Sequence, residues 1–164
     1  MAEAFINTPI GWLQIVADKN ILTRIHFMDD VPGQTDIRDS FLIECVQHLE
    51  RYFEGTLTGF PFLQKARQEG TVFQQRVWQE LINIPYGKTI SYRELAMRLG
   101  DEKCIRAAAS ANGQNNLAIV VPCHRVIGSD GSLTGYAGGL WRKKWLLEHE
   151  AKNSGKASQA SLFG

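Results

Sequence analysis

Cys123 stands in a distinctive chemical setting, because the stretch VPCHRVIG (residues 121–128) places a proline before it and His124 and Arg125 after it. A thiol becomes a strong nucleophile when it loses its proton, and its ordinary pKa is about 8.5. An adjacent imidazole acting as a base, or a nearby cation, increases the thiolate fraction. The sequence therefore favours a nucleophilic cysteine over a buried structural thiol.

The position of His124 relative to the sulfur has two solutions. Neighbouring residues on a continuous strand point to opposite faces of the sheet. Either the chain turns at Pro122–Cys123, or the imidazole reaches the sulfur through a water molecule. Two acids near the C-terminus, Glu148 and Glu150, are candidates to orient the imidazole.

The other cysteines, Cys45 and Cys104, make an odd total of three at wide spacings. This pattern argues against a disulfide framework and for a reducing compartment. There is no C-x-x-C pair and no H-x-x-x-H pair, and the four histidines are scattered. Such spacings do not fit a zinc site, so we expect neither a metal nor a cofactor.

Composition describes an ordinary globular chain of 164 residues, with 44% hydrophobic and 21% charged residues. No apolar run approaches the length of about 20 residues that a membrane span needs, and the N-terminus does not resemble a secretion signal. We expect a cytoplasmic protein that does not contact the membrane. The net charge of +1 is uneven: residues 1–68 hold six Lys/Arg against nine Asp/Glu, and residues 69–150 hold ten against eight.

The first part of the chain predicts a small sheet followed by a helix. The segments AFINT, WLQIVA and ILTRIHF are separated by turn residues, which is typical of an antiparallel meander. Apolar residues then recur at helical spacing from Phe41 to Phe53, and Gly55 follows as a stop. Cys45 lies on that apolar stripe, so we expect it in the core.

The second part predicts a helix-turn-helix. Thr71 with Gln74, and Ser91 with Glu94, have the spacing of N-terminal capping boxes. Asp101 can cap a third helix, and two short helices joined at LGDEK are typical of this motif. Residues 118–121 (AIVV) predict a short strand that Pro122 ends, and residues 140–150 predict a final helix.

The third helix carries small residues after Arg106, and two interpretations are open. It is either a buried helix packed tightly against its neighbours or a helix that lies close to another surface. Small side chains suit entry into the minor groove of DNA, which is about 6 Å wide. Arg106 is then the one long side chain that can probe the duplex.

The segment VPCHRVIG, with SYRELA upstream and GYAGG and WLLEHE downstream, resembles the O6-alkylguanine-DNA alkyltransferases of the single-chain bacterial type. The similarity covers residues 71–150, and a weaker similarity extends over the N-terminal meander and helix. It implies an enzyme of DNA repair that works once: an alkyl group moves irreversibly from O6-alkylguanine, and also from O4-alkylthymine, to Cys123. It also implies base flipping through the minor groove, double-stranded alkylated DNA as the partner, and a monomer.

The resemblance assigns roles to individual residues. His124 takes the thiol proton through a water, and Glu150 holds and polarises His124. Asn115 braces the turn around the cysteine, Tyr92 stabilises the leaving base, and Arg106 fills the stack after the nucleotide rotates out. The residues expected to contact DNA or the base are Arg106, Ala107, Ala108, Ser110, Arg125, Val126, Tyr136, Ala137 and Gly138.

These expectations combine into an α/β (α+β) protein of two domains. Residues 1–68 form a ribonuclease-H-like sheet-plus-helix domain, residues 69–150 form a winged-helix-like helix-turn-helix domain with the acceptor cysteine, and residues 151–164 form a disordered tail. Three rival functions remain: a lesion-binding module without transfer, a helix-turn-helix regulator, and a cysteine hydrolase with turnover. The presence of Cys123 opposes the first, and the run of alanines opposes the second.

Overall fold

The chain divides into two units, and the computed structural model describes residues 1–30, 32–33 and 37–163. Unit 1 comprises Met1–Glu69 with Asn116–Val120, and unit 2 comprises Gly70–Asn115 with Val121–Gly164. The sequence interpretation drew the boundary at residues 68 and 69 and left residues 116–120 in the C-terminal domain. The structure places that short segment in unit 1 instead.

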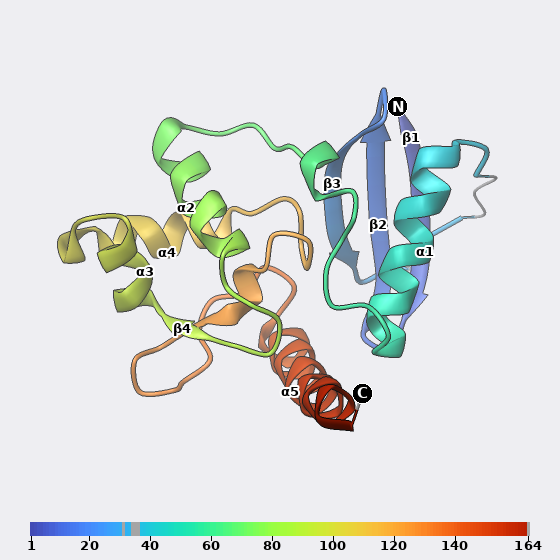
Figure 1. Cartoon of the computed structure of the whole chain (residues 1–164). Coiled ribbons are helices and arrows are strands. Elements are labelled where there is room, and N and C mark those ends of the chain that lie inside the picture. The colour runs from blue at the N-terminus through green and yellow to red at the C-terminus, as the bar shows by residue number, and fades with distance from the viewer. Residues whose placement is uncertain (31, 34–36, 164) are drawn as a thin grey trace. The chain divides into compact units, whose positions relative to one another are not determined.

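Unit 1 is a three-stranded antiparallel sheet with one helix packed on it (Figure 1). The strands β1 (Ala2–Thr8), β2 (Gly11–Asp18) and β3 (Ile21–Met28) lie in the order β1-β2-β3. Helix α1 (Ser40–Glu54) begins at Asp39, whose side chain accepts a hydrogen bond from Leu42 N, and it ends at Gly55 with φ 82°. Its buried stripe is Phe41, Leu42, Cys45, Leu49 and Tyr52. The predicted meander and helix are therefore present.

The segment that follows Asn115 is not the strand that the sequence predicted at residues 118–121. Only Leu117 bridges to β3, at Ile25, and the next residues form turns. Ile119 has φ 73°, a left-handed conformation that is uncommon for a β-branched residue. The apolar run was interpreted as a strand, but buried residues are apolar in turns as well as in strands.

Unit 2 carries the helix-turn-helix. Helix α2 (Val72–Ile82) begins with the predicted capping box, in which Thr71 and Gln74 each accept a backbone hydrogen bond from the other. Helix α3 (Tyr92–Arg98) begins at Ser91, and a 3₁₀ turn (Glu102–Cys104) leads into α4 (Ile105–Gly113). Helix α4 packs against both α2 and α3. Two short strands, β4 (Ile90–Ser91) and β5 (Val126–Ile127), pair in parallel beside a second 3₁₀ turn (Cys123–Arg125).

Helix α5 (Leu140–Phe163) runs through the tail that the sequence predicted to be disordered (Figure 1). Residues 151–163 contain alanine, lysine and glutamine and no proline, so they can extend an existing helix. Extension adds a hydrogen bond per residue without the cost of a new nucleus. Within the described residues, no helix has the length and apolar character needed to cross a membrane.

Candidate active site

Cys123 opens a 3₁₀ turn, which settles the question of how the chain passes through this residue. Cys123 N donates to Val121 O at 2.8 Å, and Arg125 N donates to Pro122 O at 3.0 Å. Successive side chains on such a turn are about a third of a rotation apart rather than on opposite faces. The chain therefore does turn at Pro122–Cys123, but neither ring nitrogen of His124 hydrogen-bonds the Cys123 sulfur. The turn by itself does not replace the water-mediated alternative.

Two asparagine side chains, one in α4 and one just after it, hold this turn. Asn115 Nδ2 donates to Val121 O at 2.8 Å, as expected of a bracing residue, and Asn115 also hydrogen-bonds the Cys123 side chain. Asn112 Nδ2 donates to Cys123 O at 3.3 Å. Asn112 is 2% exposed and was missed by the sequence interpretation. A polar residue in a run of alanines was the available signal, because a buried amide needs partners.

Cys123 is 6% exposed, and burial raises the pKa of its thiol. The Asn115 hydrogen bond and the charge of Lys143 act in the opposite direction without reversing the shift. The resting sulfur therefore holds its proton at neutral pH. A base must remove that proton before the sulfur can attack.

His124 is oriented to be that base. Its Nε2 donates to Glu150 Oε2 at 2.7 Å, and both side chains are buried. Its other ring nitrogen, Nδ1, has no hydrogen-bond partner among the described residues. Burial lowers the pKa of His124 despite the opposing effect of Glu150, so the imidazole is neutral at pH 7 and Nδ1 can accept a proton.

Glu150 joins His124 to Arg125. Burial by itself raises the pKa of Glu150, but His124 and Arg125 together bring that pKa well below its ordinary value. Arg125 donates through Nε to Oε1 at 2.8 Å and through Nη2 to Oε2 at 3.0 Å. The carboxylate is thus ionised, and both of its oxygens are engaged.

Arg125 lies elsewhere than the sequence predicted. It was expected to contact DNA, but it is 7% exposed, and its remaining nitrogen Nη1 donates to Ile84 O at 2.7 Å. A guanidinium with three such bonds inside the protein is not available to a phosphate or a base. The 3₁₀ turn at Cys123–Arg125 directs the Arg125 side chain toward Glu150, a partner 25 positions along the chain.

Tyr92 and Lys143 form a second polar group near the cysteine. The Tyr92 hydroxyl donates to Thr134 O at 3.0 Å, and Lys143 Nζ donates to the same carbonyl at 2.8 Å. Lys143 Nζ lies 3.4 Å from the Tyr92 hydroxyl. Electrostatic effects of Cys123 on the pKa of both residues place the sulfur nearby. The sequence interpretation found Tyr92 but not Lys143, which reads as part of an ordinary basic stretch, RKK.

A pocket of about 420 Å³ lies beside these groups, within the size range of small-molecule sites. Of the predicted residues, Tyr92, Arg106, Tyr136 and Ala137 line it. The other lining residues are Ile105, Ala109, Gly113, Thr134 and Gly135. Burial raises the pKa of Tyr136 well above its ordinary value, with Cys123 contributing to the shift. The pocket wall therefore includes two tyrosines that lie close to the thiol.

The remaining predicted residues divide by exposure. Arg106, Ala107 and Ser110 are exposed on α4, as a DNA-facing surface requires. Ala108 is fully buried, so its side chain is not accessible to DNA. Val126 is also fully buried, but the expectation for Val126 concerned its backbone and stays a prediction. Ala108 was misplaced because a helix presents only some of its small residues to one side.

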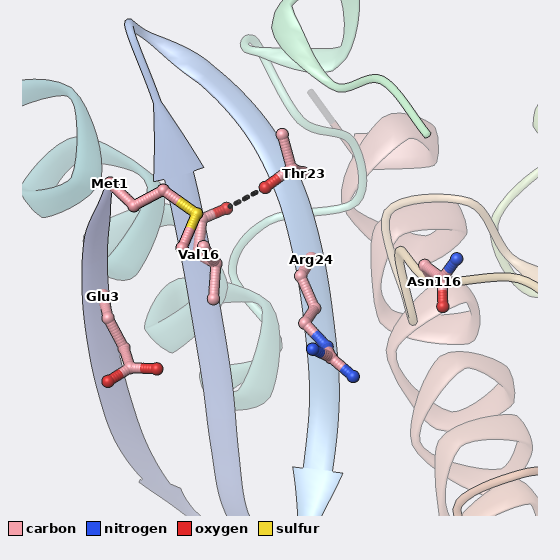
Figure 2. Close-up of a pocket in the computed structure, with 6 residues that line it drawn as sticks. All are labelled: Met1, Glu3, Val16, Thr23, Arg24 and Asn116. Atoms are coloured by element: carbon pink, nitrogen blue, oxygen red, sulfur yellow. Dashed lines mark hydrogen bonds between the residues drawn. The ribbon is translucent and has the colours of Figure 1, made fainter. Parts of the chain in front are cut away.

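Unit 1 has its own hollow, of about 610 Å³, on its sheet (Figure 2). Thr23 Oγ1 donates to Val16 O at 3.3 Å across two strands. Glu3 and Arg24 point from separate strands and do not meet in Figure 2. The lining contains no cysteine or histidine, and we assign it no chemistry.

Fold and site together define a class of protein. It has a helix-turn-helix whose second helix borders a pocket, and a buried cysteine followed in the chain by a histidine that is hydrogen-bonded to a glutamate. Two family models match the chain in agreement with this description. The ribonuclease-like domain of 6-O-methylguanine DNA methyltransferase matches residues 1–64, and the DNA-binding domain of the same family matches residues 72–152. The chain belongs to the 6-O-methylguanine DNA methyltransferase family.

Known relatives agree over most of the length. The methylated-DNA–protein-cysteine methyltransferase of Methanosarcina acetivorans is 43% identical over 155 residues, which cover 92% of this chain and 98% of the relative. The protein of the same description from Mycobacterium tuberculosis is 44% identical over 149 residues, covering 88% and 89%. The crystal structure of Mycobacterium tuberculosis OGT in complex with DNA superimposes with a TM-score of 0.83 at 42% identity, covering 93% of this chain and 94% of that chain.

Proposed function

We propose that this protein repairs double-stranded DNA by moving an alkyl group from O6-alkylguanine, and from O4-alkylthymine, to Sγ of its own Cys123. The observation that carries the proposal is the buried Cys123, whose charge acts on two tyrosines that line the pocket, Tyr92 and Tyr136. The next residue, His124, is hydrogen-bonded to Glu150. The family and its DNA-bound relative support DNA as the partner. Three free cysteines fit a reducing compartment, so we place the protein in the cytoplasm, working as a monomer.

Access to the buried sulfur requires that the target base leave the helix. A stacked base cannot bring its O6 substituent to the thiol of a residue that is only 6% exposed. Extrusion costs a few kcal/mol, and less for a mispaired base. Arg106 is exposed on α4 and also borders the pocket, so its side chain is placed to occupy the space that the rotated nucleotide leaves. The exposed Ala107 and Ser110 let α4 approach the minor groove closely.

The transfer itself is a displacement at a saturated carbon. His124 Nδ1 takes the thiol proton through a bridging water, and Glu150 stabilises the imidazolium that results. The sulfur attacks the alkyl carbon, the carbon–O6 bond breaks, and its electron pair stays on the guanine. Tyr92, which lines the pocket, donates its hydroxyl hydrogen to the leaving base. The product is a thioether, so the protein works once.

Intact-protein mass measurement tests the proposal directly. The protein is incubated with duplex DNA that contains O6-methylguanine, and one methyl group in place of one hydrogen is expected per molecule, located on Cys123. Cys123→Ser should gain nothing yet keep its affinity for the duplex. Cys104→Ser is the matched control, because Cys104 Sγ donates to Ala96 O at 3.8 Å and is outside the lining of the pocket; this variant should react like the wild type. Tight lesion binding without a mass change in the wild type would identify a binding module instead.

A further inference from the structure

We propose that Asn116 is a positioning residue for alkyl transfer, because its contacts with Gln68 and His26 hold a strained segment that leads into the turn of Cys123. The segment is Asn116–Val120, which belongs to unit 1. This inference rests on the proposed function. Asn116, Gln68 and His26 are all outside the lining of the pocket, so they can act on the transfer only through the chain that they hold.

The segment contains a strained turn at Ile119. Val120 N donates to Ala118 O at 2.8 Å, which closes a three-residue γ-turn, and Ile119 at its centre has φ 73°. A γ-turn of this hand is rare and strained, and a β-branched residue adds to the strain. The other non-glycine residues with positive φ in the described part of the chain, Lys19 and Asn20, form the turn between β2 and β3. Strain such as that at Ile119 persists only where the surrounding structure holds it, and it is concentrated at functional sites.

The strained turn is followed directly by the turn that leads into the acceptor. Pro122 has φ −82° and ψ 64°, and Cys123 N donates to Val121 O at 2.8 Å across it. These values describe a second γ-turn, of the opposite hand to the first. The same Val121 carbonyl accepts from Asn115 Nδ2 at 2.8 Å. Because the two tight turns adjoin, a change of backbone conformation at Ile119 changes the direction in which the chain reaches Cys123.

Asn116 fixes the start of the segment through its backbone and its side chain. Asn116 N donates to Gln68 Oε1 at 2.8 Å, and Asn116 Oδ1 lies 3.2 Å from His26 Nε2. Asn116 O accepts from Ile25 N at 2.8 Å, and Ile25 O accepts from Ala118 N at 3.2 Å. The residues before the strained turn are therefore tied to β3 and to Gln68.

His26 is prepared as a donor to Asn116. Arg24 Nε donates to His26 Nδ1 at 3.1 Å, so this ring nitrogen accepts and Nε2 carries the hydrogen. Burial lowers the pKa of His26, and the charge of Arg24 lowers it further against the opposing effect of Asn116, so the imidazole is neutral at pH 7. Loss of the Asn116 contacts should let the segment relax toward an unstrained backbone at Ile119.

The rate of single-turnover transfer from O6-methylguanine duplex, measured together with affinity for that duplex, tests the inference. Asn116→Ala removes the Oδ1 acceptor, and we expect the rate to fall about tenfold, the order of one hydrogen bond. Affinity should stay at the wild-type value, because the proposed DNA contacts are Arg106, Ala107 and Ser110 on α4. Asn116→Asp keeps an acceptor in this place and should restore most of the rate. Asn7→Ala, at an exposed asparagine of β1, is the matched control and should react like the wild type.

Labelling with iodoacetamide separates positioning from a general loss of stability. Unfolding would expose Cys123 and Cys45 together. A loosened turn should instead increase the labelling of Cys123 in Asn116→Ala several-fold, while Cys45, fully buried on α1, stays protected. Gln68→Leu removes the acceptor of Asn116 N and should give the same pattern.

The inference is overturned by a wild-type rate in both Asn116→Ala and Gln68→Leu, or by a rate in Asn116→Asp as low as that in Asn116→Ala. Labelling of Cys123 and Cys45 that rises in parallel would also overturn it, because the contacts would then serve stability alone. Failure of the wild type itself to gain a methyl group would instead refute the proposed function.

Discussion

Replacing Glu150 by glutamine should damage both the stability and the chemistry of the protein. The Glu150 carboxylate accepts from His124 Nε2 and from two nitrogens of Arg125, and it lies 3.4 Å from Gly87 N. A glutamine has one accepting oxygen and one donating nitrogen in the same place. At least one of the buried donors then faces another donor, and Arg125 loses its counter-charge.

The size of the effect follows from burial, because Glu150 is 1% exposed and Arg125 is 7% exposed. Removing one partner of a buried ion pair costs about 3–5 kcal/mol of unfolding free energy. For a chain of this size, each kcal/mol shifts the melting temperature by about 2–4 °C, so a drop of roughly 6–20 °C is expected. The rate of alkyl transfer should fall by about 10²- to 10⁴-fold, because His124 loses the group that fixes its tautomer.

Thermal unfolding and single-turnover transfer measure the two effects, with Glu148→Gln as the matched control. Glu148 sits two residues away, is exposed, and should change stability by less than about 0.5 kcal/mol. The lowered pKa of Glu150 in the folded state means that its contribution is complete above the ordinary value of about 4.3. That contribution is lost as the pH falls below this value toward the lowered folded pKa. The melting temperatures of the wild type and Glu150→Gln should therefore converge in acid. Equal melting temperatures for the two glutamine variants at pH 7 would refute the reasoning.

Other predictions concern single side chains. Arg125→Lys should lower the melting temperature although the charge is kept, because one ammonium cannot reproduce bonds to both Glu150 oxygens and to Ile84 O. Calorimetry measures the melting temperature, and an unchanged melting temperature would contradict the prediction. Cys45 is fully buried, and burial is the main cause that raises its pKa to about 12. It should therefore resist iodoacetamide at pH 8 until the protein unfolds. Labelling of Cys45 in the folded state, measured by peptide mass, would count against its position in the core. Arg106→Ala should slow transfer from duplex DNA more than transfer from the free O6-alkylguanine base; equal slowing would remove Arg106 from the flipping step.

Local patterns in the sequence predicted the elements well. The Thr71–Gln74 capping box and the glycine stop at Gly55 are contacts between residues within four or five positions, so their spacing alone reveals them. The alternating strands of unit 1 and the helix-turn-helix of unit 2 are equally local in origin. The relation of Cys123, His124 and Glu150 was predicted through the family resemblance rather than through spacing.

Long-range contacts account for what the sequence did not reveal. Arg125 is held by Ile84 and Glu150, which are 41 and 25 positions away, and no pattern around residue 125 encodes those partners. Lys143 looks like any helical lysine until Tyr92 and Thr134 are brought beside it. The run at residues 118–121 is apolar because it is buried, and the left-handed Ile119 prevents the strand that its composition favours.

The raised pKa of Cys123 fits a protein that can use its sulfur only once. An ionised, exposed thiolate reacts with oxidants and stray electrophiles, and each such reaction would consume a molecule before it met a lesion. A buried thiol keeps its proton at neutral pH, and His124 Nδ1 is the acceptor for that proton in the proposed transfer. The same burial that lowers the resting reactivity of the sulfur also limits the access of bulk water to it. A substitution that exposes Cys123 without touching His124 should accordingly increase its reactivity toward iodoacetamide more than its rate of repair.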